Sequence, residues 1–111
     1  MLIMSLAVFT VVAVMGLGMV GDIYRGIGTP KMFGFIHAGF AAFGSALVIL
    51  VALEGDNRVW INIGLAVVII LLGILLGFRR AKGPAPKAIL VAHGGLAVIC
   101  YVILAYNAFT G

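Results

Sequence analysis

The sequence predicts an all-α integral membrane protein folded as a four-helix up-and-down bundle. Of its 111 residues, 65% are hydrophobic and only 9% are charged, whereas soluble domains average about 25% charged residues. Four apolar runs occupy residues 1–20, 32–53, 59–78 and 88–109. Each is close to the roughly 20 residues that cross a hydrocarbon core about 30 Å thick. Because the connections are short, we expect one transmembrane domain covering residues 1–111.

The boundaries of the runs support four separate helices. The first run lacks a basic n-region and is longer than the hydrophobic part of a signal peptide, so it predicts a retained helix. Pro30 and Pro86 precede the second and fourth runs, where the missing N–H of proline costs little. Residues 54–57 (Glu-Gly-Asp-Asn) predict a tight hairpin between the second and third helices.

Charge predicts the orientation of the bundle. Six of the seven basic residues lie near two connections: Arg25, Lys31, Arg79, Arg80, Lys82 and Lys87. Lys and Arg in short loops stay on the cytoplasmic side, so we expect cytoplasmic basic loops and both termini outside. The net charge of +4 follows from this asymmetry. It does not indicate a nucleic-acid interface, because the chain has no soluble basic face with interleaved aromatic residues.

A weak internal repeat relates residues 1–56 to residues 57–111. At an offset of 56 the matched pairs are Gly21 and Gly77, Pro30 and Pro86, Lys31 and Lys87, His37 and His93, and Gly39 and Gly95. Each repeat would contain two spans, so the two repeats would have the same orientation in the membrane. The expected arrangement is therefore two fused parallel repeats related by a pseudo-two-fold axis along the membrane normal.

Two histidines at matched depth are the main indication of function. Ionisable side chains within spans are rare and usually functional. His37 and His93 each follow a lysine by six residues, which places each about 9 Å along its helix from the basic boundary. The second and fourth spans are diagonal partners in an up-and-down bundle. We therefore predict that His37 and His93 are the metal ligands of one planar cofactor, since haem iron accepts axial histidine. A histidine within a span can instead hydrogen-bond to a neighbouring helix, and that alternative stays open.

Glycines and basic residues complete the predicted site. Glycine allows close backbone approach. The last turns of the first and third spans lie level with the histidines and contain Gly16, Gly18, Gly21, Gly73 and Gly77. The predicted pocket wall includes Gly18, Gly21, Gly39, Gly77 and Gly95. Arg and Lys pair with carboxylates, so the predicted partners of the haem propionates are Arg25, Lys31, Arg79, Arg80 and Lys87. Small residues at four-residue spacing also predict close helix packing. The basic residues also serve as topology signals or bind lipid headgroups, and these alternatives stay open.

With this histidine pair, its neighbouring glycines and four spans, the chain resembles the membrane b-type cytochromes. That resemblance implies haem b and electron transfer, with the haem near the cytoplasmic face. One ligand pair implies one haem, whereas many such cytochromes stack two across the bilayer. The expected electron partners are quinone or another membrane subunit. No catalytic residue is predicted, and an electron carrier or redox-complex subunit is favoured over a stand-alone enzyme.

Two other functions fit the same sequence. The chain would serve as a cofactor-free accessory subunit, packing against other membrane subunits or copies of itself. Alternatively, the histidines would hold a chlorophyll-type pigment. A carboxylate-coupled drug transporter is disfavoured because no span contains Asp or Glu. A zinc or copper transporter needs more ligands than two histidines.

Overall fold

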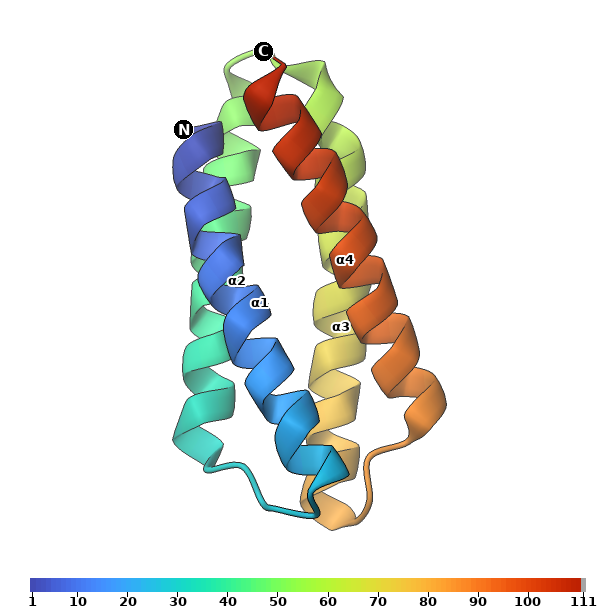
Figure 1. The fold of residues 1–111 in the computed structure, drawn as a ribbon. Helices are drawn as coiled ribbons and strands as arrows, with labels where there is room; N and C mark the ends of the chain where they lie inside the picture. Colours follow the sequence, from blue (N-terminus) through green and yellow to red (C-terminus); the bar gives the residue numbers. More distant parts are fainter. Residues whose placement is uncertain (111) are drawn as a thin grey trace.

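The computed structural model describes residues 1–110 as four helices of equal length joined by short loops (Figure 1). The helices are α1 (Leu2–Tyr24), α2 (Lys31–Leu53), α3 (Trp60–Lys82) and α4 (Lys87–Phe109), and a 3-10 turn, η1 (Asn57–Val59), precedes α3. These residues contain no strand, which confirms the all-helical prediction. Gly111, the end of the predicted second repeat, lies outside the described residues.

All four helices are long and apolar enough to cross a membrane. Each has 23 residues, or about 34 Å at the usual helical rise. Their outward faces carry large apolar side chains such as Leu17, Phe35 and Leu71, which are 72%, 71% and 61% exposed. Contiguous apolar surface of this extent is rare on soluble monomers. The fold therefore indicates an integral membrane protein.

The helices begin where the sequence predicts, whereas two of them end later than predicted. Pro30 and Pro86 are the residues before α2 and α4 and have extended backbone. However, α1 continues to Tyr24 and α3 to Lys82, about one turn beyond the predicted ends at residues 20 and 78. The added turn of α3 contains Arg79, Arg80 and Lys82, and a helix C-terminus favours cations whose long side chains reach the interface. The added turn of α1 has no basic residue.

The bundle consists of two helical hairpins (Figure 1). α1 packs mainly along α2 and α3 mainly along α4, with fewer contacts between the two pairs. The two chain ends and the α2–α3 connection meet at one end, here called the terminal end. The α1–α2 and α3–α4 loops lie at the other end, here called the basic end. Gly26 and Gly55 have φ of +69° and +110°, so these positions after α1 and α2 require glycine conformations.

The packed core lies in the half of the bundle next to the terminal end. Its buried hydrophobic residues are Leu6, Leu47, Val48, Val51, Ala52, Val59 and Leu104. Ser5 is fully buried beside them and donates to the Gly44 carbonyl, joining α1 to α2. In the half next to the basic end, no side chain of the described residues is fully buried. His37 and His93 lie in this less densely packed half.

Candidate functional site

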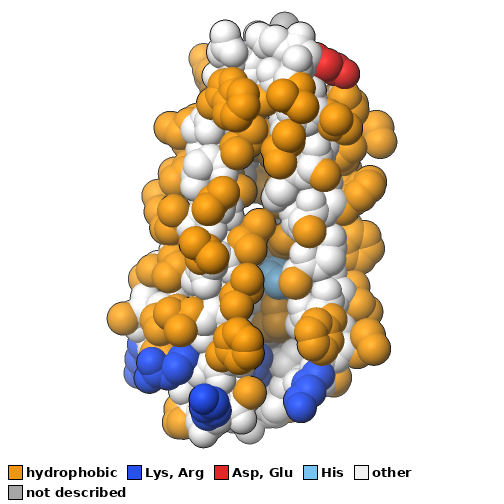
Figure 2. Space-filling model, turned by 180° about the vertical axis from the view of Figure 1, so that it is seen from behind, with side chains coloured by type: hydrophobic (Ala, Val, Ile, Leu, Met, Phe, Trp, Pro, Cys, Tyr) orange, Lys and Arg blue, Asp and Glu red, His pale blue; other side chains and the backbone are white. Residues whose placement is uncertain are grey.

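The structure brings His37 of α2 and His93 of α4 together across the bundle. Their ring centroids are 6.5 Å apart and their planes differ by 62°. Both rings are partly buried. In Figure 2, which views the bundle from behind with α2 and α3 in front, a histidine is visible in the furrow between the helices. The blue Lys and Arg side chains gather below it at the basic end. The two imidazoles thus lie near one another in a T-shaped arrangement.

A hydrogen bond to α3 orients the ring of His93. Nδ1 of His93 lies 2.8 Å from the carbonyl oxygen of Ile69. A carbonyl only accepts hydrogen bonds, so Nδ1 must carry the proton and donate. In the neutral imidazole, Nε2 then keeps its lone pair. Histidines that bind metals are commonly held in this way, with the other ring nitrogen donating to a backbone carbonyl.

Gly73 makes room for this arrangement. It lies four residues after Ile69 on α3, and helical side chains lean back over the preceding turn. A Cβ atom at Gly73 would meet Cε1 of His93 at 2.9 Å and Nδ1 at 3.4 Å. A side chain there would therefore displace the imidazole from the Ile69 carbonyl.

His37 has a matching environment on α1. A Cβ atom at Gly16 would lie 3.4 Å from Cε1 of His37, and the Val12 carbonyl, four residues earlier, faces the ring. Val12 and Gly16 relate to His37 as Ile69 and Gly73 relate to His93. The two halves differ in one respect, because the buried Nδ1 of His37 makes no hydrogen bond of ordinary geometry within residues 1–110.

Of the glycines predicted to lie level with the histidines, only Gly16 and Gly73 would bring a Cβ atom near the rings. A Cβ atom at Gly18, Gly39, Gly77 or Gly95 would have nothing within 4 Å. At Gly21 it would approach only the Arg25 guanidinium, at 3.8 Å. Their role as a pocket wall stays a prediction. The contacts with the rings lie about one turn further from the basic end, which matches the extra turn of α1 and α3.

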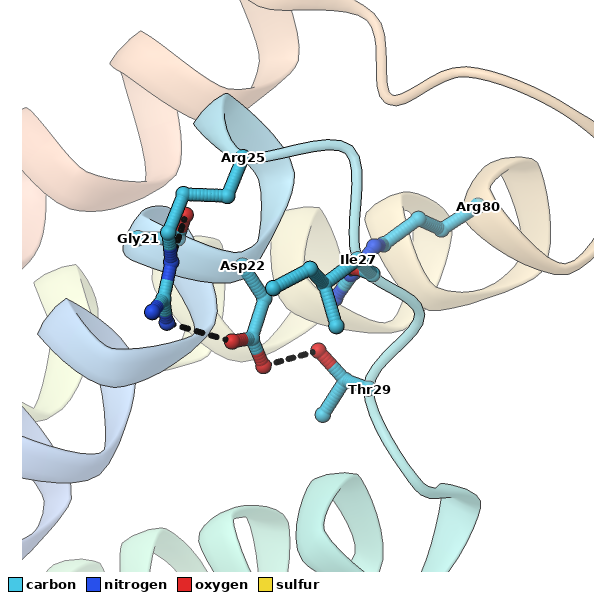
Figure 3. Close-up of polar contacts among 6 residues, drawn as sticks. All are labelled: Gly21, Asp22, Arg25, Ile27, Thr29 and Arg80. Carbon is cyan, nitrogen blue, oxygen red and sulfur yellow. Dashed lines mark hydrogen bonds and ion pairs between the residues drawn. The ribbon is translucent and has the colours of Figure 1, made fainter.

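Polar contacts at the basic end tie its loop together (Figure 3). Asp22 accepts hydrogen bonds from Arg25 at 3.1 Å and from Thr29 at 2.9 Å. Arg80 of α3 donates to the Ile27 carbonyl at 3.3 Å and links the two hairpins. These two arginines are therefore already engaged.

The other three basic residues that the sequence predicted for the site do not make such contacts. Lys31, Arg79 and Lys87 have no ion pair or side-chain hydrogen bond to another part of residues 1–110. They are exposed at the basic end. Among the five basic residues, these three are consequently the more available to an anionic group. Their role toward a propionate stays a prediction.

Two hollows lie away from the histidines. A cavity of about 170 Å³ in the middle of the bundle has walls from all four helices and includes Asn62 and Cys100. A more open hollow of about 400 Å³ lies at the terminal end, where Glu54, Asp56 and Arg58 contribute to its rim. Asn62 was not predicted as a site residue from the sequence, although an asparagine inside an apolar run is a visible signal.

The site has two strong metal donors. Within residues 1–110, no group of three or more His, Cys, Asp and Glu side chains is arranged to hold a metal ion. Two imidazoles are an incomplete ligand set for a bare metal ion. No protein family, curated protein or solved structure matches this chain.

Proposed function

We propose that this chain is a membrane electron-transfer protein that binds one haem b between His37 and His93. The observation that carries the proposal is the convergence of these rings from two diagonal helices, with centroids 6.5 Å apart. Two imidazoles that bind one first-row metal at about 2 Å each place their centroids about 6 Å apart. The observed separation is compatible with that requirement.

Further features of the residues present support the fit. The Ile69 carbonyl holds the proton of His93 on Nδ1, which leaves Nε2 for a metal. Nδ1 of His37 is buried without a partner, and a small rotation toward the Val12 carbonyl would satisfy it. The surrounding half of the bundle has no fully buried side chain among residues 1–110, so the hairpins have little packing to lose by separating around a flat group.

Haem, when bound, supplies reversible one-electron chemistry at iron. The chain's own residues would do three things. His37 and His93 would hold the group and fix its depth, the apolar helix faces would exclude water, and basic residues would neutralise the propionates. Among these basic residues, Arg79 is exposed in the last turn of α3 and has no competing ion pair within residues 1–110.

The proposed orientation places the basic end in the cytoplasm, following the distribution of Lys and Arg. The haem would then lie nearer the cytoplasmic face. Electrons would be exchanged with quinone in the bilayer or with a partner subunit. A single haem in one half of the bilayer would not by itself carry an electron across the membrane.

A cofactor-free accessory subunit is the second candidate, and one observation favours it. The space beside several glycines is open: a Cβ atom at Gly34, Gly39, Gly94 or Gly95 would have nothing within 4 Å. Small residues on a membrane helix let a neighbouring helix approach closely. Such faces would suit other membrane subunits or a second copy of this chain.

The absorption spectrum of the purified protein tests the proposal. We expect a red protein with a sharp band in the reduced state, and His37→Ala and His93→Ala should each abolish or sharply reduce haem content. Ser45→Ala is the control, because Ser45 bonds only to its own helix, at the Ala41 carbonyl. A colourless wild-type protein would favour the accessory subunit, and a chlorophyll-type spectrum would favour a pigment. Unchanged haem content in both histidine variants would exclude these ligands.

A further inference from the structure

A buried asparagine lines the open hollow at the terminal end. Asn107, in the last turn of α4, is only 6% exposed and forms part of the wall of this hollow. Its side chain makes no hydrogen bond to another group in residues 1–110. Both of its amide atoms keep accessible surface, in contrast to the enclosed Oδ1 of Asn62, which also has no partner. A buried amide without partners is costly, so a ligand that reached Asn107 from the hollow would be stabilised.

The rim of the hollow carries both signs of charge. Asp56 holds the Arg58 guanidinium, whose Nε and Nη2 donate to this carboxylate at 3.0 and 2.8 Å. The Arg58 side chain is 42% exposed, and a guanidinium has five N–H donors, so donors remain for an anion. Glu54 is exposed and has no ion pair within residues 1–110. Because Asp56 offsets the charge of Arg58, the carboxylate of Glu54 is available to a cation.

The position of the hollow matches the depth of lipid headgroups. Trp60, the first residue of α3, and Tyr106, beside Asn107, are 50% and 69% exposed at the same end. Exposed Trp and Tyr residues are enriched where the membrane meets water. The hollow also has an apolar side that includes Leu2 and Ile3, and Ile3 is 53% exposed on the outside of α1. Its volume of about 400 Å³ is within the usual range of ligand sites, about 300–1,000 Å³.

We propose that this hollow binds the headgroup of an ethanolamine phospholipid, with the ammonium on Glu54 and Asn107, the phosphate on Arg58 and the acyl chains in the bilayer. A primary ammonium has three N–H donors, which match a carboxylate and an amide oxygen. A choline headgroup has no N–H donor. A headgroup with a phosphate and no ammonium would leave Glu54 without a cation. The site lies at the opposite end from the basic loops and does not depend on a haem.

The test is a titration of the full chain in dodecyl maltoside micelles with dioleoylphosphatidylethanolamine, with isotope-labelled isoleucine methyl groups observed by NMR. A saturable shift is expected for Ile3, which lines the hollow. No saturable shift is expected for Ile74, which is 51% exposed on α3 and lies outside the hollow. Dioleoylphosphatidylcholine lacks the N–H donors and dioleoylphosphatidylglycerol lacks the ammonium, so each should bind about tenfold more weakly.

Two variants test the contacts to the ammonium group. Glu54→Gln should weaken binding of the ethanolamine lipid about fivefold, the upper range of an exposed ion pair. Asp22→Asn makes the same change of charge at the basic end and is its control. Asn107→Leu should weaken binding about tenfold, because the amide is lost. Asn57→Leu is its control, since Asn57 is exposed in η1 and lies outside the wall of the hollow. Both control variants should bind as the wild type does.

Three results would overturn the lipid site. Equal affinity for the ethanolamine and choline lipids, or no shift of Ile3, would leave water as the partner of Asn107. Soluble phosphoethanolamine carries the same headgroup without acyl chains, and binding as tight as that of the lipid would assign the hollow to a soluble ligand. Unchanged binding in Glu54→Gln would reject the ammonium contact, and this exposed substitution decides the matter if Asn107→Leu does not fold.

Discussion

Gly73 of α3 lies directly beneath the imidazole of His93, where an added Cβ atom would meet Cε1 at 2.9 Å. The corresponding contact in the first hairpin, between Gly16 and His37, is looser at 3.4 Å. Two chemically identical substitutions therefore probe one tight and one ordinary contact. If the tight contact holds His93 in position, only the substitution at Gly73 should be costly. If both histidines are loosely held, the two substitutions should have the same effect.

Gly73→Ala should destabilise the bundle by about 1–2 kcal/mol, because overpacking costs more than the helix gains. Gly16→Ala should be neutral or stabilise it by up to about 1 kcal/mol, since alanine is the better helix former. Thermal unfolding of both variants in detergent, without haem, measures the difference. Equal effects of the two substitutions would contradict the tight contact at His93.

If the haem proposal is correct, Gly73→Ala should also alter ligation. A tilted or displaced His93 would no longer hold its Nδ1 proton on the Ile69 carbonyl, and the electronic character of a bound iron would change. The electron paramagnetic resonance spectrum of the oxidised protein is the readout. Gly16→Ala is the control, and a spectrum unchanged by Gly73→Ala would show that this glycine does not position the ligand.

The orientation is tested at the α2–α3 connection. Asn57→Cys in a Cys100→Ser background should react with a membrane-impermeant maleimide from outside the cell, because the positively charged loops are expected in the cytoplasm. Gly83→Cys in the same background is the opposite-side control and should react only after the membrane is opened. The reverse pattern would invert the bundle and move the proposed haem to the other face.

Arg79 and Arg25 offer a comparison of two cations at the basic end. Arg25 already pairs with Asp22 at 3.1 Å, whereas Arg79 has no ion pair within residues 1–110. Arg79→Gln should therefore lower haem affinity roughly fivefold, the upper range of an exposed ion pair. Arg25→Gln should change it less. A haem titration of both variants measures the ratio, and a larger effect at Arg25 would reject Arg79 as the propionate partner.

The α2–α3 connection has a pH dependence of its own. Hydrogen bonds from the Arg58 side chain, at 3.0 and 2.8 Å, lower the pKa of the Asp56 carboxyl below its ordinary value. Because this pKa is lower in the folded state, the stabilisation is present above the ordinary pKa of about 3.9. It is lost as pH falls through the folded-state value.

Arg58→Gln should consequently raise the pKa of Asp56 toward the ordinary value. The carbon-13 shift of the Asp56 carboxyl, followed through an acid titration, gives the pKa in both proteins. Coincident titration curves would show that the Arg58 contact does not persist in solution.

The sequence by itself determined the four helices, the proline starts of α2 and α4 and the placement of two histidines in one half of the bundle. These are local properties, because span length, a missing proline N–H and the position of charges depend on neighbouring residues alone. The ends of α1 and α3 were missed by about one turn. The apolar run that predicts a span ends near the first charged residue. The helix itself continues beyond it, with its long side chains at the interface.

Only the tertiary structure decided what surrounds the histidines. Of the glycines predicted at this depth, Gly16 and Gly73 lie against the rings and Gly21 and Gly77 do not. The register between antiparallel helices depends on where each helix ends and how the loop returns. The unpartnered Oδ1 of Asn62 also arises between helices, since its amide bonds to Cys100, 38 residues away. Contacts of this kind depend on packing between distant segments, which no local pattern of residues specifies.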